Sequence, residues 1–396
     1  MSPPPILHLL PGQDRRLRTG HPWVFANEVR MDEAARGLEP GSLVQLVDAR
    51  DQFVAWAHAN PHSLIVARVL TRQRQATVDE AFLHRRLARA LQVRERLYAG
   101  TPYYRLVHAE ADFLPGLVVD RFGDVLAVQL NTAGMTRLEA PLLAALDALL
   151  APRAVVLRND SPARELEGLE PEVRVAKGTV EPPVEVGENG LMFLADPIEG
   201  QKTGWYYDQA DNRAFAARLA RDQRVLDLYS YSGAFALAAL QGGAREALAI
   251  DRSERSLELA VASAERNGLA ESLRTERAEA FAAIDALSGD RQRFGVVVAD
   301  PPSFVRSKRE LNQGLRGYRK LARGAAALVA EGGFLAIACC SHHVSAAAFA
   351  DEVRRGLRDA ARPARLLHEA GAAPDHPTHP ALPESAYLKC LVYALD

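Results

Sequence analysis

The sequence predicts an α/β protein whose C-terminal part, residues 186–396, forms a doubly wound, Rossmann-like sheet. From about residue 191 onward, strand-like and helical segments alternate: RVLDLYS precedes GAFALAALQGG, and EALAID precedes SERSLELAVASAERNGL. Such alternation is typical of parallel sheets covered by helices. Two later apolar runs, FGVVV and GGFLAI, lead into the short segments ADPPSF (299–304) and ACCSH (338–342). Open sheets of this kind bind ligands at the carboxyl ends of their strands, so both segments are candidates for a functional site.

Two smaller domains are predicted before this sheet. Residues 1–75 contain the strand-like runs SLVQLVD (42–48), FVAWAHA (53–59) and SLIVARVL (63–70), separated by turn residues. This spacing predicts a small β-barrel. Residues 76–185 combine helical patterns at 78–98 and 136–150 with strand-like runs at 116–130 and 154–160, which predicts a small α+β domain. The Pro-, Gly- and Glu-rich stretch 171–190 is the candidate linker to the last domain.

Composition narrows the class of protein. A chain of 396 residues exceeds one ordinary domain, and 48% apolar with 25% charged residues is typical of a soluble globular protein. Because the formal net charge is −2, any nucleic-acid surface must gather its basic groups on one face. Residues 1–16 lack the basic start and apolar core of a signal peptide. No apolar run reaches about 18 residues, so no membrane span is expected.

The three cysteines, Cys339, Cys340 and Cys390, point to thiol chemistry. Two of them are adjacent and none has the spacing of metal ligands, so neither a disulfide framework nor a metal site is expected. This usage fits a reducing cytosol, and we expect a cytoplasmic protein in which a thiol can serve as a nucleophile.

The segment VLDLYSYSGAF (225–235) reads as a strand, a turn of small residues and the start of a helix. Its single Gly233 does not make the GxGxxG fingerprint, which disfavours nicotinamide cofactors. Ser230, Ser232 and Gly233 would let a ligand approach the backbone closely, and Asp227 could hold a cationic amine.

Two further acids follow in order along the chain. Asp251 ends the second strand, where a carboxylate can accept both hydroxyls of a ribose. Glu279 follows the third strand-like region and could accept a hydrogen bond from the exocyclic amine of adenine. Any one such acid is more often solvated than liganded, but the ordered set with Asp227 fits an adenosine that bears a zwitterionic amino acid. S-adenosylmethionine is such a molecule.

ADPPSF and ACCSH suggest alkylation of a pyrimidine carbon. A thiolate that adds to carbon 6 of cytosine activates carbon 5, and a carboxylic acid at the neighbouring ring nitrogen stabilises the charge that forms. Cys340 is the proposed nucleophile and Asp300 the proposed acid. The base that removes the carbon 5 proton is left open among His342, His343 and a water.

Other interpretations remain at this point. A strand-end cysteine is usually a packing residue, and an Asp-Pro-Pro-aromatic segment also serves amine methylation, in which Phe304 would stack on the base without help from a cysteine. The alternative function is therefore RNA N-methylation of guanine or adenine. A third is an RNA-binding or assembly factor with a vestigial methyltransferase fold, against which the acids at 227, 251 and 300 argue.

Several motifs in order along nearly the whole chain resemble one family. These are GHPWVFANEV (20–29), LPGLVVDRFGD (114–124), KTGWYYDQADNR (202–213), VLDLYSYSGAF, ADPPSF, LNQGLRGYRKL (311–321) and DHPTHPALPESAYLK (375–389). Together they resemble the RlmI-like 23S rRNA (cytosine-5) methyltransferases. The resemblance implies an N-terminal PUA domain that binds RNA, a small α+β domain, and a class I methyltransferase domain whose last strand is antiparallel.

The resemblance also implies roles for individual residues. Cys340 takes the position of the family's nucleophile, whereas Cys339 stands where a small residue is usual and is expected to be structural. Glu279 stands where the family has Asp, which places its adenine contact in question. The expected cofactor-binding residues are Lys202, Gln209, Asp227, Tyr229, Ser230, Gly233, Asp251, Glu279 and Asp300.

The N-terminal segment supplies candidates for RNA contact. Arg15, Arg16, Arg18 and Arg68 could meet phosphates, and Trp23 and Phe25 could stack on exposed bases. A barrel core is the alternative for the two aromatic residues, and a solvated face is the alternative for the arginines. The expected partner is 23S rRNA or an assembly intermediate of the large subunit. The target cytosine is open, and so is the oligomeric state, with a homodimer as one alternative.

Overall fold

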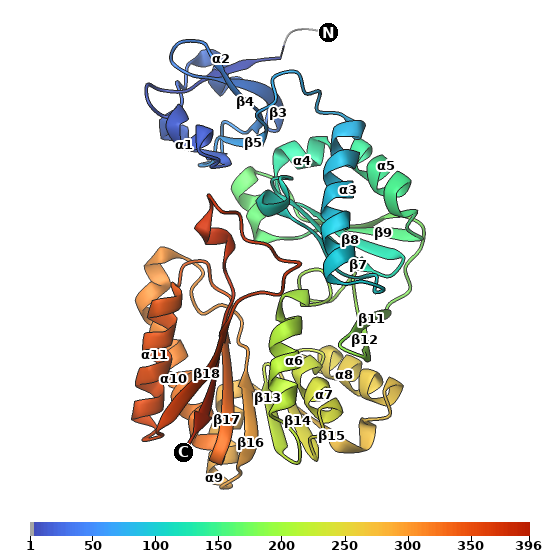
Figure 1. The fold of residues 1–396 in the computed structure, drawn as a ribbon, viewed down its shortest axis with the longest axis vertical. Helices are drawn as coiled ribbons and strands as arrows, with labels where there is room; N and C mark the ends of the chain where they lie inside the picture. The colour runs from blue at the N-terminus through green and yellow to red at the C-terminus, as the bar shows by residue number, and fades with distance from the viewer. Residues whose placement is uncertain (1–3) are drawn as a thin grey trace. The chain divides into compact units, whose positions relative to one another are not determined.

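The structure, a computed structural model, describes residues 4–396, so residues 1–3 of the predicted barrel and of the signal-peptide prediction lie outside it. The chain folds into two compact units, and Figure 1 draws both as a ribbon coloured by residue number. The N-terminal unit comprises Met1–Pro182, Asp196–Trp205 and Asp375–Ser385, and the C-terminal unit comprises Pro183–Ala195, Tyr206–Pro374 and Ala386–Asp396. The chain therefore passes between the units five times. The division into three domains at residues 75 and 185 stays a prediction.

The N-terminal unit begins with a small five-stranded sheet in the order β1-β3-β4-β5-β2. Its strands are β1 (Ile6–His8), β2 (Trp23–Val24), β3 (Ser42–Val47), β4 (Phe53–Ala59) and β5 (Ala67–Thr71), and its helices are α1 (Asp14–Arg18) and α2 (Glu33–Arg36). Side chains alternate between the two faces of a strand, so Val44, Leu46, Ala55 and Ala57 are buried together in a small core.

The strand β5 begins at Ala67, four residues later than the third predicted run, 63–70. Asn60 holds a turn at this point, because its side-chain oxygen accepts a hydrogen bond from the His62 amide at 3.1 Å. Its side-chain nitrogen donates to the Glu167 backbone carbonyl at 3.0 Å. Beside this turn, residues 63–66 stay out of the ladder, although their sequence is strand-like.

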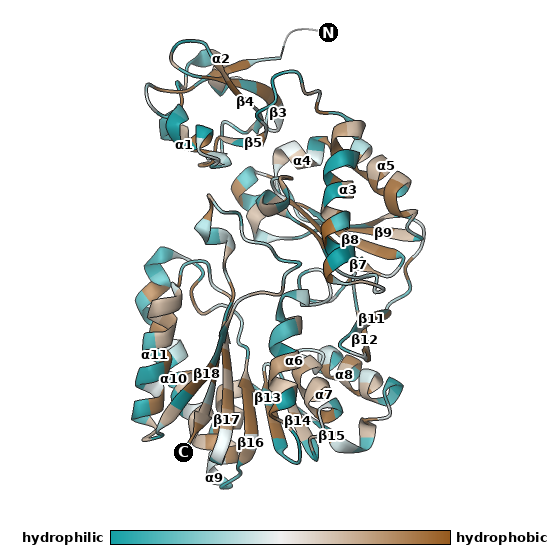
Figure 2. Cartoon of the chain, in the orientation of Figure 1, coloured by the Kyte–Doolittle hydropathy of each residue, from teal (hydrophilic) through white to brown (hydrophobic). Residues whose placement is uncertain are grey.

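A second sheet of the same unit has the order β10-β9-β8-β7-β6. Its strands are β6 (Tyr103–His108), β7 (Leu117–Phe122), β8 (Val125–Leu130), β9 (Ala154–Asn159) and β10 (Glu172–Lys177). The helices α3 (Glu80–Leu97), α4 (Ala133–Arg137) and α5 (Glu139–Leu150) accompany it. Figure 2 shows β8 and β9 in apolar brown and hydrophilic residues along much of α3, as expected for a helix with one buried face.

The predicted linker at 171–190 is mostly strand. β10 occupies its first part, and β11 (Val184–Glu188) pairs with β12 (Leu191–Ala195) around Asn189 and Gly190. Both turn residues have positive φ, 51° and 83°, the conformation that an Asn-Gly hairpin turn requires. The first of the five crossings between the units falls between Pro182 and Pro183, inside the predicted linker.

The C-terminal unit contains a seven-stranded sheet in the order β15-β14-β13-β16-β17-β19-β18. Its strands are β13 (Arg224–Leu228), β14 (Glu246–Asp251), β15 (Leu273–Arg277), β16 (Phe294–Ala299), β17 (Val329–Cys339), β18 (Ala364–Ala370) and β19 (Lys389–Leu395). The first five strands in this order are parallel, and β19 runs antiparallel to both β17 and β18. The strand β18 was not predicted, because its residues are mostly exposed and carry no apolar run.

Helices cover this sheet in two groups. They are α6 (Ala210–Arg218), α7 (Ala234–Gln241), α8 (Glu254–Arg266), α9 (Ala280–Gly289), α10 (Leu311–Leu328) and α11 (Ala346–Asp359). α6 packs on α7, whereas α10 packs on α9 and α11, and Figure 1 shows α10 and α11 apart from α6, α7 and α8. A large core lies between α9, α10, α11 and the sheet, where residues such as Tyr318 and Phe349 are fully buried. Within residues 4–396, no helix is both long and apolar enough to cross a membrane.

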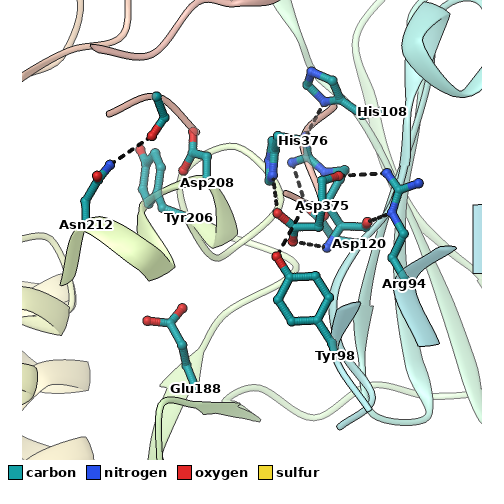
Figure 3. Close-up of polar contacts among 12 residues, drawn as sticks. Arg94, Tyr98, His108, Asp120, Glu188, Tyr206, Asp208, Asn212, Asp375 and His376 are labelled. Carbon is teal, nitrogen blue, oxygen red and sulfur yellow. Dashed lines mark hydrogen bonds and ion pairs between the residues drawn. The ribbon is translucent and has the colours of Figure 1, made fainter. Parts of the chain in front are cut away.

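A buried polar network fixes residues 375–385 to the second sheet of the N-terminal unit (Figure 3). Arg94, which is 1% exposed, donates to both carboxylate oxygens of Asp112 at 2.6 and 2.8 Å and to the Asp375 carbonyl at 2.7 Å. The Asp375 carboxylate accepts from the Arg105 amide at 2.8 Å and contacts His376 Nδ1 at 2.7 Å. Burial alone would raise the pKa of Asp375, but His376 and Arg105 outweigh burial and hold that pKa below its usual range.

We expect Arg94→Met to lower the free energy of unfolding by about 3–5 kcal/mol, because it leaves the buried Asp112 carboxylate and two carbonyls without their donor. Chemical denaturation followed by circular dichroism measures this change. Arg96→Met, on the exposed side of the same helix, is the control and should leave the denaturation midpoint unchanged. Equal midpoints for the two variants would show that the network contributes nothing.

Candidate cofactor and catalytic site

The parallel order of the sheet brings three of the predicted residues to one edge. Asp227 lies near the end of β13, Asp300 directly follows β16, and Cys340 directly follows β17, which are adjacent strands. Their registers align Asp227 with Val298 and Ala299 with Ile337. The Cys340 sulfur lies 3.9 Å from the Pro301 carbonyl oxygen, so the thiol is next to the residue that follows Asp300.

A strained loop follows β13 and shapes the space beside Asp227. Tyr229, Tyr231 and Gly233 have φ values of 60°, 49° and 71°, a left-handed conformation that costs a non-glycine residue free energy. Only glycine suits the third position, since a Cβ there would stand 2.8 Å from the Ala260 Cβ. Such strain concentrates at ligand-binding loops, and here it turns the backbone so that a ligand can approach it.

Several buried polar atoms around this loop have no protein partner in the described part of the chain. They are one carboxylate oxygen of Asp227 and the hydroxyls of Ser230 and Ser232, and the side-chain nitrogen of Gln209, elsewhere in the same unit, is unpaired as well. Leaving such groups unpaired costs about 1–3 kcal/mol each, so a cluster of them indicates a polar ligand. Two hydroxyls, an amide donor and a carboxylate suit the amino-acid part and ribose of an adenosyl cofactor.

The environment of Asp227 changes its protonation. Burial raises the pKa of this carboxyl to about 8, and the neighbouring carboxylates of Asp300 and Asp251 add to the rise. The Ala236 amide, which donates to Asp227 at 3.0 Å, opposes it. A ligand that brings an ammonium group to this carboxyl would favour its ionised form.

The two other predicted acids lie along the same edge. Asp251 ends β14 and accepts the Tyr231 and Ser253 amides at 2.9 and 2.8 Å, which orients its carboxylate. Glu279 is exposed at the start of α9. The pKa of Tyr229 is raised mainly by burial and, to a smaller extent, by the nearby charge of Glu279. The structure thus brings Asp227, Asp251 and Glu279 to the ends of three successive strands.

The remaining expected cofactor residues divide between the units. Gln209 ends the short helix Tyr207–Gln209 of the C-terminal unit, where Asn212 donates to its side-chain oxygen at 2.6 Å. Lys202 belongs to the N-terminal unit, in a turn where its φ is 52°. Its contribution to the cofactor site stays a prediction.

The two adjacent cysteines differ in environment. Cys339 is fully buried, and burial raises the pKa of its thiol, against smaller opposing effects of Tyr318 and Lys389. Cys340 is half-buried at the strand end. Of the two candidate bases beside it, His342 is exposed with its ring 5.2 Å from that of Tyr387, and His343 is also exposed.

Lys389 was not predicted from the sequence. It begins β19 opposite Cys339 in the antiparallel pairing of β17 and β19. Its ammonium donates to the Ser341 carbonyl at 2.6 Å and to the Tyr387 carbonyl at 2.9 Å, so it lies beside the Cys339–Ser341 segment. Burial lowers the pKa of Lys389, and the thiols of Cys339 and Cys340 act in the opposite direction. Only the antiparallel register of β17 and β19 places Lys389 beside the cysteines, and no local sequence pattern predicts that register.

The N-terminal RNA candidates are placed differently from one another. Arg15 is exposed, and Arg18 is paired with Asp14 at 2.7 Å and Asp48 at 2.9 Å. Arg68, 13% exposed, pairs with Glu167 at 2.6 Å. These contacts do not test RNA binding, which stays a prediction for each of the three.

The two N-terminal aromatic side chains pack edge to face, with ring centroids 6.5 Å apart. Trp23 is half-buried, and its indole nitrogen donates to Glu110 at 2.8 Å. The Arg16 guanidinium lies over the Phe25 ring and donates to both carboxylate oxygens of Glu28. Base stacking by Trp23 or Phe25 stays a prediction beside the alternative of a core role.

Comparison with known proteins identifies the class of this site. The family of PUA-like domains matches residues 7–72, and the S-adenosylmethionine-dependent methyltransferase family matches residues 170–394, more than half of the chain. The chain belongs to the S-adenosylmethionine-dependent methyltransferases. The predicted fold class and cofactor are therefore confirmed.

Individual relatives match this chain over nearly its full length. The chain is 35% identical over 396 residues to the protein named Ribosomal RNA large subunit methyltransferase I of Pseudoalteromonas atlantica, with 99% of each chain covered. The protein of the same name from Cronobacter sakazakii is 36% identical over 388 residues, 97% of each chain. A solved methyltransferase in complex with S-adenosylhomocysteine shares the fold with a TM-score of 0.84 at 19% identity, covering 98% of this chain and 100% of that one.

We expect the affinity for S-adenosylhomocysteine to increase with pH because the buried Asp227 carboxyl must ionise to hold the ligand's ammonium. Its pKa is about 8 before the ligand binds. Below that value the dissociation constant should fall by up to roughly tenfold per pH unit, and above it the dependence should level off. Isothermal titration calorimetry between pH 6 and pH 9 measures this profile.

Asp227→Asn should bind more weakly and lose the pH dependence, because the amide cannot ionise. Asp285→Asn, at an exposed position of α9, is the control and should keep the slope of the parent protein. A parent affinity that is flat from pH 6 to pH 8 would contradict this role of Asp227.

Proposed function

We propose that this methyltransferase forms 5-methylcytosine in 23S rRNA of the large ribosomal subunit. The observation that carries the proposal is the position of the Cys340 sulfur, 3.9 Å from the Pro301 carbonyl and thus beside Asp300. A thiol and a carboxyl at neighbouring strand ends are the two groups that alkylation of a pyrimidine carbon requires. The names of the full-length relatives and the PUA-like domain support large-subunit rRNA as the substrate.

The proposed reaction begins at the thiol. The Cys340 thiolate adds to carbon 6 of cytosine, and Asp300 donates a hydrogen bond or a proton to ring nitrogen 3, which absorbs the electron pair displaced from the ring. S-adenosylmethionine supplies the methyl group that carbon 5 takes up, and S-adenosylhomocysteine remains. A base then removes the carbon 5 proton, the double bond forms again, the Cys340 sulfur leaves as thiolate, and a proton given to nitrogen 3 returns to Asp300.

The geometry offers less support for RNA N-methylation. That alternative needs the Phe304 ring to stack on the target base. The ring instead packs 4.8 Å from the Tyr318 ring and 6.4 Å from the Phe281 ring, between centroids, within the cluster beneath α10. A phenyl group engaged in this way is poorly placed to leave its neighbours for a base.

The test of the proposal is a trapping experiment. With S-adenosylmethionine and rRNA fragments that contain 5-fluorocytosine, we expect a stable protein–RNA adduct on Cys340, because fluorine blocks the final elimination. Mass spectrometry of the digested adduct identifies the residue and the nucleotide. Methyl transfer to unmodified RNA without any adduct on fluorinated RNA would favour N-methylation.

Cys340→Ala should lower kcat by at least about 10⁴-fold because it removes the nucleophile. Cys339→Ala is the matched control: that thiol is fully buried, so the variant should keep activity if it remains folded. The double variant Cys339→Ala, Cys340→Ala tests whether Cys339 takes over as nucleophile when Cys340 is absent. Full activity of the double variant in an assay of tritiated methyl transfer would overturn the cytosine-5 mechanism.

Lys389 is the proposed positioning residue for the nucleophile. Its ammonium lies beside the segment that carries Cys340, held by the carbonyls of Ser341 and Tyr387. An ammonium has three N–H donors, so two carbonyls leave one donor and the positive charge to act on the neighbouring thiols. This charge stabilises a thiolate relative to a thiol.

The rate at which iodoacetamide alkylates Cys340 rises with pH, because only the thiolate reacts. In Lys389→Met this rise should occur at a pH about one unit higher, so that the reaction at pH 7 is roughly tenfold slower. Lys389→Arg keeps the charge and should restore most of the rate. Cofactor affinity should stay unchanged in both. An unaltered pH profile in Lys389→Met would leave the lysine with a structural role only.

A further inference from the structure

We propose that the exposed face of α10 and the turn before it bind the phosphate backbone of the RNA substrate. This strip, which we name the α10 strip, consists of Arg306, Lys308, Arg309, Arg316, Lys320 and Arg323. Residues 306–323 contain seven basic residues and one acidic residue, in a chain whose net charge is −2. The identity of the polyanion as rRNA rests on the proposed function, whereas the surface itself is read from the structure.

The strip faces away from the core. Helix α10 buries Gly314, Tyr318 and Leu321 against the sheet and neighbouring helices. Arg316, Lys320 and Arg323 are three or four residues apart, so they share the opposite face, and all three are exposed. Arg306, Lys308 and Arg309 extend this row of charges before the helix begins, and each is exposed.

The charges of the strip are not neutralised by the protein. None of its six side chains forms an ion pair with a carboxylate of residues 4–396. The single acid of the segment, Glu310, accepts the Arg306 backbone amide at 3.0 Å. On the neighbouring helix α11, by contrast, Arg354 pairs with Asp351 and Arg355 with Glu352, both at 2.8 Å.

The strip begins at the proposed catalytic residues. Gly314 lies so close to the segment after Asp300 that a Cβ there would stand 2.5 Å from the Phe304 carbonyl oxygen. The Val305 carbonyl accepts the Ser341 hydroxyl at 2.7 Å, which joins the residue after Cys340 to the same segment. A strand of RNA whose cytosine reaches Cys340 would therefore pass the start of α10.

A row of cations that no carboxylate neutralises suits a chain of phosphates beside a site for a nucleobase. One of them, the Lys320 ammonium, also lies 4.6 Å from the centre of the Phe281 ring. Each phosphate contact releases counterions, so binding through the strip must depend on salt concentration. RNA fits this surface better than an acidic protein does, because the strip starts next to the segment after Asp300 and next to Ser341, where the base of the RNA substrate is proposed to react.

The test compares two triple variants with the same change of charge. Arg309→Gln, Arg316→Gln and Lys320→Gln together remove half of the strip. Arg354→Gln, Arg355→Gln and Arg358→Gln on α11 are the matched control. The probe is a transcript of large-subunit rRNA, and fluorescence anisotropy measures its dissociation constant from 50 to 300 mM salt, with polyglutamate as a second probe.

We expect the strip variant to bind RNA at least about tenfold more weakly at 0.15 M salt and its slope of log K against log salt to fall by about 2–3. The α11 variant should keep the parent slope, and both should bind S-adenosylhomocysteine as the parent does. An unchanged slope in the strip variant, an equal loss in both variants, or a loss confined to polyglutamate would overturn the proposal. The trapping experiment on Cys340 does not depend on these slopes. A failure of the proposed function can therefore be told apart from a failure of the α10 strip to bind RNA.

Discussion

The parallel pairing of β13, β16 and β17 is the constraint on which the site depends. Because these strands point the same way, Asp227, Asp300 and Cys340 reach one edge although 113 residues separate the first from the last. One antiparallel neighbour, β19, then delivers Lys389 to the same edge from its opposite end. Reversing the direction of any one of these strands would carry its functional residue to the far side of the sheet.

The cofactor side and the nucleophile side of this edge are built in different ways. Beside Asp227 the protein leaves buried oxygens unpaired and holds a loop in a strained conformation, so the site stores free energy that a ligand can recover. Beside Cys340 the polar groups are satisfied: Ser341 bonds Val305, and Lys389 bonds two carbonyls. The first arrangement favours binding of a polar ligand, and the second favours a fixed position of the sulfur.

Much of this could be predicted from the sequence, because it is encoded locally. Alternating strands and helices predicted the sheet, and acids at strand ends predicted the positions of Asp227, Asp251 and Asp300. The features that the sequence analysis missed depend on distant partners. Lys389 acquires its neighbours through pairing with β17, fifty residues earlier in the chain. The strand-like residues 63–66 lie outside β5, next to the turn that Asn60 forms with the help of its hydrogen bond to Glu167. Strands within the predicted linker 171–190 form because they pair with β9 and with β12 in the folded protein.

The passage of the chain between the units has a consequence for biosynthesis. Arg94 is buried against the carbonyl of Asp375, which leaves the ribosome 281 residues later. The N-terminal unit therefore cannot complete its polar core during translation until Asp375 has been made, and β19 completes the C-terminal sheet later still. Domains usually fold in the order of their synthesis. Here the N-terminal unit must wait for residues 375–385, which follow most of the C-terminal unit in the chain, so the two units complete their folding at nearly the same stage.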